Sequence, residues 1–128
     1  GAAIGLAGLE EFDETLAYRR ALYRRYVENL SKLSDVVIAD DFNPRKQHAA
    51  WLFTILIEKR VDCQLKLRSR RIESAQTHFR NDRYTVFGCD ETFPAMDAVD
   101  DKYLVLPLHT KMSLGDVDSV CEVLKEGW

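Results

Sequence analysis

The residues best suited to chemistry stand close together in the run IESAQTHFRNDRYTVF at residues 72–87. Imidazole, guanidinium, amide and phenol groups follow one another there, at His78, Arg80, Asn81, Arg83 and Tyr84. These groups can all donate hydrogen bonds, and a guanidinium matches phosphate oxygens in bidentate geometry. The run therefore predicts a binding site for an anionic, oxygen-rich ligand. Spacing alone leaves open an alternative, a solvated turn that carries two surface arginines.

Charge is unevenly distributed along the 128 residues, although the net charge is only −3. Positive charge concentrates in a cationic zone at residues 59–83, and negative charge concentrates between Asp90 and Asp101. A cationic zone on a mildly acidic protein favours a confined anion site over a surface that follows a polyanion. A single-stranded nucleic-acid module with Phe79 and Tyr84 as stacking residues is the alternative, and the negative net charge argues against it.

The remaining reactive residues form no recognisable motif. The three histidines lie far apart in the sequence without helical pairing, so we expect no metal site. Three cysteines without a CxxC pair indicate reduced thiols in a cytoplasmic protein, with Cys63 and Cys121 as small core residues. No apolar run in the sequence is long enough to cross a bilayer, so we expect no membrane partner.

The hydrophobic pattern predicts the elements that position these residues. Residues 2–33 are expected to form one long helix, because Leu9, Leu16, Tyr23 and Leu30 recur every seven residues, while Arg19 interrupts the adjacent apolar row. Strands are predicted at 35–39, 48–57, 72–79 and 103–106, and helices at 62–70, 95–100 and after Ser113. These elements suit an α+β fold, a two-layer sandwich in which a small, mainly antiparallel sheet carries helices on one face.

The predicted strands assign a position to several side chains. Alternation places His78 and Arg80 on one face and predicts that Phe79, between them, is buried. Trp51 is expected in the core. His48 and His109 are expected to make structural hydrogen bonds at the ends of strands.

Four stretches of the chain, taken together and in this order, carry a family resemblance. They are residues 2–9 with Arg19, Arg20 and Tyr26; residues 48–53; residues 72–80; and residues 104–109 with Met112, Ser113, Asp116 and Val117. They resemble the C-terminal domain of the DegT/DnrJ/EryC1/StrS family of pyridoxal-phosphate-dependent nucleotide-sugar aminotransferases. The resemblance implies an interdomain helix at residues 1–34 and the small domain of a fold-type I aminotransferase at residues 35–128.

The resemblance also implies which functional residues belong to this chain and which belong to another domain. The Schiff-base lysine and the other residues that contact pyridoxal phosphate would belong to a large N-terminal domain, so no residue here is expected to be catalytic or to bind the cofactor. An amino acid, commonly glutamate in this family, would provide the amino group for a keto-sugar nucleotide in polysaccharide or lipopolysaccharide sugar biosynthesis. The resemblance implies a homodimeric enzyme, and its substrate-binding wall would comprise His78, Arg80, Asn81, Arg83 and Tyr84. The alternative is a non-catalytic binding or dimerisation module that uses the cationic zone.

One position departs from the family pattern. The helix predicted at 62–70 is normally followed by glycine in the family, and Arg71 stands there instead. A helix end that leads into an extended segment often requires a residue in the left-handed region. We therefore predict a positive φ at Arg71 or its immediate neighbour.

Overall fold

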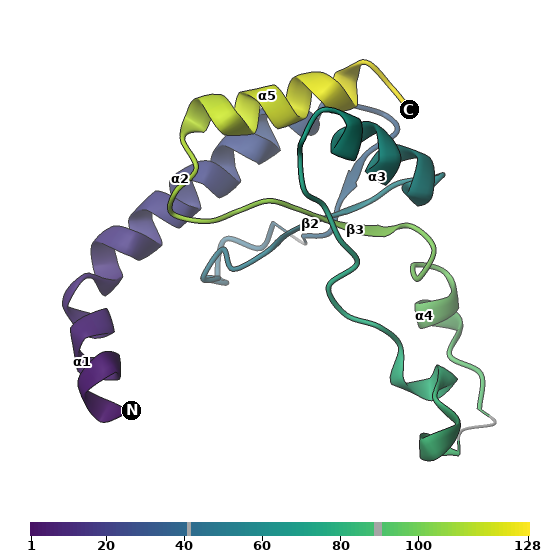
Figure 1. The fold of residues 1–128 in the computed structure, drawn as a ribbon, viewed down its shortest axis with the longest axis horizontal. Coiled ribbons are helices and arrows are strands. Elements are labelled where there is room, and N and C mark those ends of the chain that lie inside the picture. The colour runs from purple at the N-terminus through teal and green to yellow at the C-terminus, as the bar shows by residue number, and fades with distance from the viewer. Residues whose placement is uncertain (41, 89–90) are drawn as a thin grey trace.

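The computed structural model describes residues 1–40, 42–88 and 91–128. Within these ranges the chain forms helices, strands and two short 3-10 helices (Figure 1). In order they are α1 (Ala2–Glu10), α2 (Phe12–Leu30), β1 (Val37–Ile38), β2 (Phe53–Leu56), α3 (Arg60–Ser69), η1 (Asn81–Arg83), η2 (Thr85–Phe87), α4 (Pro94–Asp97), β3 (Tyr103–Leu106) and α5 (Leu114–Lys125). The predicted α+β class is confirmed.

The sheet is antiparallel, with the strand order β1-β2-β3 among the described residues. Phe53 pairs with Leu106, and Ile55 pairs with Leu104. All four side chains are buried in the core, because alternate residues of a strand point to the same face of the sheet. Helices α2, α3 and α5 lie on one side of the sheet (Figure 1). One face of the sheet therefore forms the core together with these helices.

The packing of α2 against α5 closes this core. Leu22, Tyr26 and Leu30 follow one another at four-residue spacing on α2, and all are buried. At the edge of the contact, Arg25 donates two hydrogen bonds to Asp118 of α5, with N–O distances of 2.7 and 2.8 Å. Asn29 donates a third, and the hydrogen bonds from Arg25 and Asn29 lower the pKa of Asp118 to about 2.

The start and the buried face of α5 agree with the sequence. Ser113 and Asp116 form a capping box at the start of the helix predicted after Ser113. The Asp116 backbone N–H donates to Ser113 Oγ, and the Ser113 backbone N–H donates to Asp116 Oδ2. Cys121 of α5 and Cys63 of α3 are buried, free thiols, as predicted. Burial raises the pKa of Cys63 to about 11 and that of Cys121 to about 12. Both side chains therefore act as small apolar residues.

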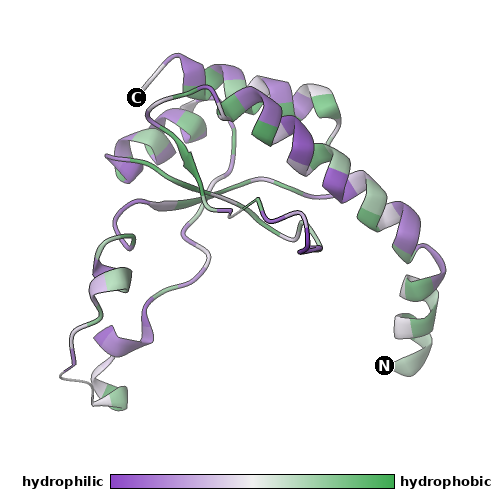
Figure 2. Cartoon of the chain, turned by 180° about the vertical axis from the view of Figure 1, so that it is seen from behind, coloured by the Kyte–Doolittle hydropathy of each residue, from purple (hydrophilic) through white to green (hydrophobic). Residues whose placement is uncertain are grey.

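The single long helix predicted at the start of the chain is wrong. The chain bends at Glu11, so that α1 and α2 run in different directions (Figure 1). The α1 segment contains Gly5 and Gly8, which weaken a helix, and none of its residues is buried. Among the described residues, no packing surface therefore holds α1 in line with α2. Figure 2 shows that α1 is mostly apolar, although no helix in the described ranges combines the length and apolarity that a membrane crossing requires.

Two of the predicted strands are also wrong in extent. The strand predicted at 48–57 begins only at Phe53, because Ala50 has a φ of 48°, which an extended strand does not allow. The segment predicted as a strand at 72–79 pairs with β3 only at Ala75, which exchanges two backbone hydrogen bonds with Val105. Beyond that bridge, Gln76 uses its side chain to accept from Arg60 and to donate to Asp100, and regular pairing ends.

The end of α3 confirms the prediction made for Arg71, whose φ is 62°. The backbone N–H of Ile72 donates to Leu67 O and that of Arg71 donates to Arg68 O, each at 2.9 Å. This pair of bonds is the Schellman motif, in which the residue after the helix takes the left-handed conformation. Leu67 and Ile72 both pack in or against the core.

Arg71→Gly is expected to stabilise the chain by about 1 kcal/mol, because it removes a Cβ from the left-handed region at a modest cost in unfolded-state entropy. Urea unfolding followed by circular dichroism measures the change. The matched control is Arg68→Gly, an exposed position inside α3, which should destabilise by about 1 kcal/mol. A loss of stability in Arg71→Gly would contradict the strain argument.

Candidate functional site

The predicted site residues lie on an arm, residues 76–88, that runs away from the sheet after the Ala75 bridge (Figure 1). The arm is irregular up to Arg80 and then turns through η1 and η2. Gly88 ends η2 with a φ of 56°, a conformation that glycine adopts without strain. The arm thus presents a run of polar side chains outside the core, and Figure 2 shows its hydrophilic character around η1.

Arg80 is the buried residue of the arm, with its side chain only 5% exposed. Its Nε donates to Asp82 Oδ1 at 2.9 Å, its Nη2 donates to Asp82 Oδ2, and its Nη1 donates to Asp97 of α4. The hydrogen bond from Arg80 lowers the pKa of Asp82, while hydrogen bonds to Asp82 and Asp97 raise the pKa of Arg80. Through its bond to Asp97, Arg80 ties the arm to α4.

The prediction that Phe79 is buried is wrong, since its side chain is 64% exposed. Strand alternation does not apply because residues 78–80 are not part of a strand. Phe79 and Arg80 instead line the same pocket. Arg80 is the buried one of the two, because its guanidinium binds the carboxylates of Asp82 and Asp97.

This pocket has a volume of about 650 Å³ and brings Arg80, Arg83 and Tyr84 together. Its remaining described lining residues are Arg60, Gln76, Phe79, Asp97, Asp100 and Asp101. Arg83 pairs with Asp100 at 2.8 Å, but its side chain is 65% exposed, so the guanidinium keeps donors directed to solvent. Asp90, the first residue of the acidic stretch, lies outside the described residues. The three arginines of the lining are matched by its three aspartates, so the pocket is polar but not strongly cationic.

His78 and Asn81 do not line that pocket. Asn81 is exposed at the start of η1. His78 is exposed too, and its ring centroid lies 6.2 Å from that of Trp51, with the two planes tilted by 56°. The prediction that Trp51 belongs to the core is wrong, because its side chain is 66% exposed.

The turn at residues 48–51 explains the position of Trp51. Arg19 of α2 donates from Nε to Ala50 O at 3.0 Å and from Nη2 to Trp51 O at 2.7 Å. Ala50 donates its backbone N–H to His48 Nδ1 at 3.0 Å, which confirms a structural hydrogen bond at His48. The positive φ of Ala50 costs about 1–2 kcal/mol. The sequence offered one signal for this turn, the cation at Arg19 within an apolar helical row.

His109 also makes the structural hydrogen bond predicted for it. His109 follows β3 and Pro107, and its Nδ1 accepts the backbone N–H of Lys111 at 3.3 Å. This bond supports the loop that leads into α5. Among the described residues no group of three or more His, Cys, Asp or Glu side chains is arranged to hold a metal ion.

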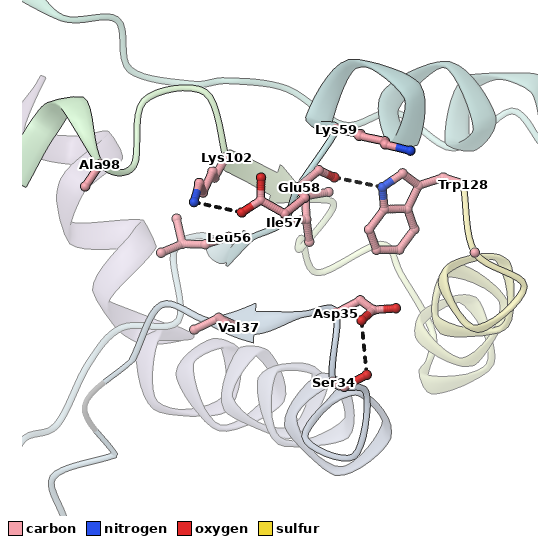
Figure 3. Close-up of a pocket in the computed structure, with 11 residues that line it drawn as sticks. Ser34, Asp35, Val37, Leu56, Ile57, Glu58, Lys59, Ala98, Lys102 and Trp128 are labelled. Carbon is pink, nitrogen blue, oxygen red and sulfur yellow. Dashed lines mark hydrogen bonds and ion pairs between the residues drawn. The ribbon is translucent and has the colours of Figure 1, made fainter.

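A second pocket, of about 550 Å³, lies at the opposite end of the sheet from the turn and is drawn in Figure 3. Several of its polar groups bind one another. Lys102 pairs with Glu58 at 2.7 Å, and the indole N–H of Trp128 donates to Glu58 O at 2.9 Å. None of the predicted site residues lines this pocket.

The interactions of Lys66, Lys102 and Lys125 do not suit a site for an aldehyde cofactor. Such a site needs a lysine whose amine is readily deprotonated within a cavity. Lys102 lies in the second pocket, but its hydrogen bond to Glu58 raises its pKa, and a hydrogen bond to Glu122 raises the pKa of Lys125. Lys66 is engaged by Gly127 O and Glu126. We therefore derive no cofactor chemistry from these three lysines.

Comparison with solved structures shows close similarity of fold over nearly the whole chain. The sugar aminotransferase CalS13 from Micromonospora echinospora is 27% identical with a TM-score of 0.92, and the match covers 98% of this chain and 34% of CalS13. AtS13 from Actinomadura melliaura is 25% identical with a TM-score of 0.92, over 99% of this chain and 34% of AtS13. The aminotransferase TlmJ from Streptoalloteichus hindustanus is 20% identical with a TM-score of 0.92, and the match covers 98% of this chain and 35% of TlmJ. This similarity supports the fold.

The chain thus spans about a third of the length of these solved proteins. No curated protein matches it. The model of the DegT/DnrJ/EryC1/StrS aminotransferase family matches residues 1–125, which is almost the entire sequence. The chain belongs to the DegT/DnrJ/EryC1/StrS aminotransferase family.

Proposed function

We propose that this chain is the C-terminal domain of a pyridoxal-phosphate-dependent sugar aminotransferase. The intact enzyme, in which an N-terminal domain precedes this chain, would transfer an amino group from an amino acid such as glutamate to a keto-sugar nucleotide. The product would enter polysaccharide or lipopolysaccharide sugar biosynthesis. The observation that carries the proposal is the family match over residues 1–125. Similarity to the sugar aminotransferase CalS13 supports the sugar substrate.

The contribution of this chain would be the substrate side of the site. Pyridoxal phosphate, when bound to the intact enzyme, supplies the electron sink for amino transfer. His78, Asn81, Arg83 and Tyr84 are exposed on the arm and would donate hydrogen bonds to the nucleotide sugar. Arg83 is suited to the diphosphate, because a largely exposed guanidinium offers several donors to phosphate oxygens. Arg80 would act through the arm, whose position it fixes by binding Asp82 and Asp97.

The assembly that we propose is a cytoplasmic homodimer. The buried free thiols Cys63 and Cys121 suit a reducing compartment. The exposed apolar residues Ile4, Leu6 and Leu9 on α1 suit a helix that packs against protein outside this chain. The division into an interdomain segment at residues 1–34 and a small domain at residues 35–128 belongs to this proposal. The C-terminal half of α2 already packs into the core of the small domain.

The test is an assay of the intact enzyme with glutamate and a panel of keto-sugar nucleotides, following 2-oxoglutarate release. We expect amino transfer to at least one nucleotide sugar. We expect the 128-residue chain alone to form no stoichiometric, borohydride-trappable adduct with pyridoxal phosphate on a single lysine. Such an adduct, together with transaminase activity, would contradict the proposal that the cofactor-binding lysine lies in the N-terminal domain. An intact protein that dimerises but binds neither substrate would favour the dimerisation module instead.

A further inference from the structure

Trp51 is exposed although two apolar residues close to it in sequence, Ala50 and Phe53, are buried. Ala50 before it is 1% exposed and Phe53 after it is 0% exposed, whereas Trp51 is 66% exposed. An indole has more apolar surface to bury than any other side chain, so leaving it in solvent forfeits a large favourable contribution. The packing of this chain does not account for its position.

The exposure of Trp51 results from a specifically bonded backbone. Arg19 donates to the carbonyls of Ala50 and Trp51, and its Nη2 also lies 3.4 Å from Leu108 O. Arg20 donates to His48 O at 3.1 Å, which fixes the start of the same turn. Two arginines and a strained Ala50 therefore hold the indole outward. Strained backbone of this kind gathers at binding sites, where the surrounding structure maintains it.

Trp51 also lies next to the candidate site. The 6.2 Å between the centroids of its ring and the His78 ring, at a tilt of 56°, places an apolar face beside a polar imidazole. A sugar ring has the complementary composition, with a face of C–H groups and an edge of hydroxyl or carbonyl oxygens. Binding sites commonly combine an aromatic surface with a few polar groups that fix orientation. The two side chains together match one sugar ring.

We propose that Trp51 is a specificity-determining residue that stacks on the sugar ring of the nucleotide substrate while His78 hydrogen-bonds its polar edge. Arg19 is then a positioning residue that presents the indole. This inference rests on the proposed function. The order of donors along the arm favours the sugar over the base as the stacked ring. Asn81 and Arg83, which suit the diphosphate, follow His78 toward the end of the arm, so the diphosphate separates the base from Trp51.

The test uses the intact enzyme and compares Trp51→Ala with Trp51→Phe. Trp51→Ala is expected to raise the KM for the keto-sugar nucleotide about 10-fold, which corresponds to about 1.4 kcal/mol, and to leave the amino-donor half-reaction unchanged. Trp51→Phe should retain most of the affinity, because a phenyl ring also stacks. The sugar-free nucleoside diphosphate, used as a competitive inhibitor, should bind both variants as it binds the wild type. Phe42→Ala is the matched control, an exposed aromatic outside the site, and should leave KM unchanged.

Arg19→Met tests the positioning role, since it removes the donors and keeps the aliphatic length. It should raise KM for the nucleotide sugar in the same direction as Trp51→Ala and leave the inhibitor constant of the nucleoside diphosphate unchanged. An equal loss of affinity for the sugar-free inhibitor in Trp51→Ala would assign the indole to the base and overturn the inference. An unchanged KM with a lowered melting temperature would make Trp51 a contact with the N-terminal domain. If the wild-type enzyme turns over no nucleotide sugar, the proposed function itself is wrong. If the wild type turns over a nucleotide sugar and Trp51→Ala leaves KM unchanged, this inference alone is wrong.

Discussion

Replacing Phe53 with alanine is expected to lower the free energy of unfolding of this chain by about 3–5 kcal/mol. Phe53 is fully buried, and its ring stacks on Tyr26 at 4.5 Å and meets Tyr23 edge-on at 4.8 Å. The substitution removes the apolar surface of the ring and leaves a cavity between β2 and α2. Because domains of this size are stable by only about 5–15 kcal/mol, the loss is a large fraction of the total.

Urea unfolding followed by circular dichroism measures this loss. Phe42→Ala serves as the control, because Phe42 is 55% exposed and truncation at exposed sites usually changes stability by less than about 0.5 kcal/mol. A loss below about 1 kcal/mol in Phe53→Ala would mean that the core around β2 repacks freely, contrary to the ring geometry described above.

The second large effect is expected at Arg80. In the intact enzyme, Arg80→Ala should lower kcat/KM for the keto-sugar nucleotide on the order of 100-fold, because small misplacements of binding groups cost that much. The variant releases the arm from α4 and leaves Asp82 and Asp97 unpaired beside a ligand of negative charge. The amino-donor half-reaction should be unaffected, since glutamate carries no diphosphate.

Asp97→Ala distinguishes positioning from direct contact at Arg80. This substitution breaks the link between the arm and α4 but keeps the guanidinium. If Arg80 acts by holding the arm, Asp97→Ala also lowers kcat/KM for the nucleotide sugar. An unchanged or increased kcat/KM in Asp97→Ala, combined with a loss in Arg80→Ala, would show that Arg80 contacts the diphosphate itself.

Patterns with a fixed local geometry were predictable from the sequence. The positive φ at Arg71 follows from the way a helix ends, and the capping box of α5 follows from Ser113 and Asp116. The strand β3 was also predictable, because YLVL is apolar and ends at Pro107. Each of these predictions depends on neighbours in sequence, so no knowledge of distant partners is needed.

Features that depend on a distant partner were not predictable. Residues 72–79 alternate like a strand, but alternation does not show whether the sheet has a free edge to pair with. Within this segment, Ala75 alone pairs with the sheet, at Val105 of β3. Trp51 stands in an apolar run, and its exposure arises from carbonyl bonds to Arg19 more than thirty residues earlier. Arg80 was predicted as a phosphate ligand from its residue type, and the carboxylate of Asp97 on α4 could not be inferred from spacing.

The closure of the core by α2 and α5 has a consequence for biosynthesis of the chain. Arg25 and Asp118 are 93 positions apart, and Tyr26 donates to Pro107 O across 81 positions. The buried face of α2 therefore emerges from the ribosome long before the helix that covers it. Contacts of such long range slow folding and leave apolar surface exposed meanwhile. This domain completes its fold only after translation has delivered α5, and during that interval Leu22, Tyr26 and Leu30 form a surface that a chaperone can bind.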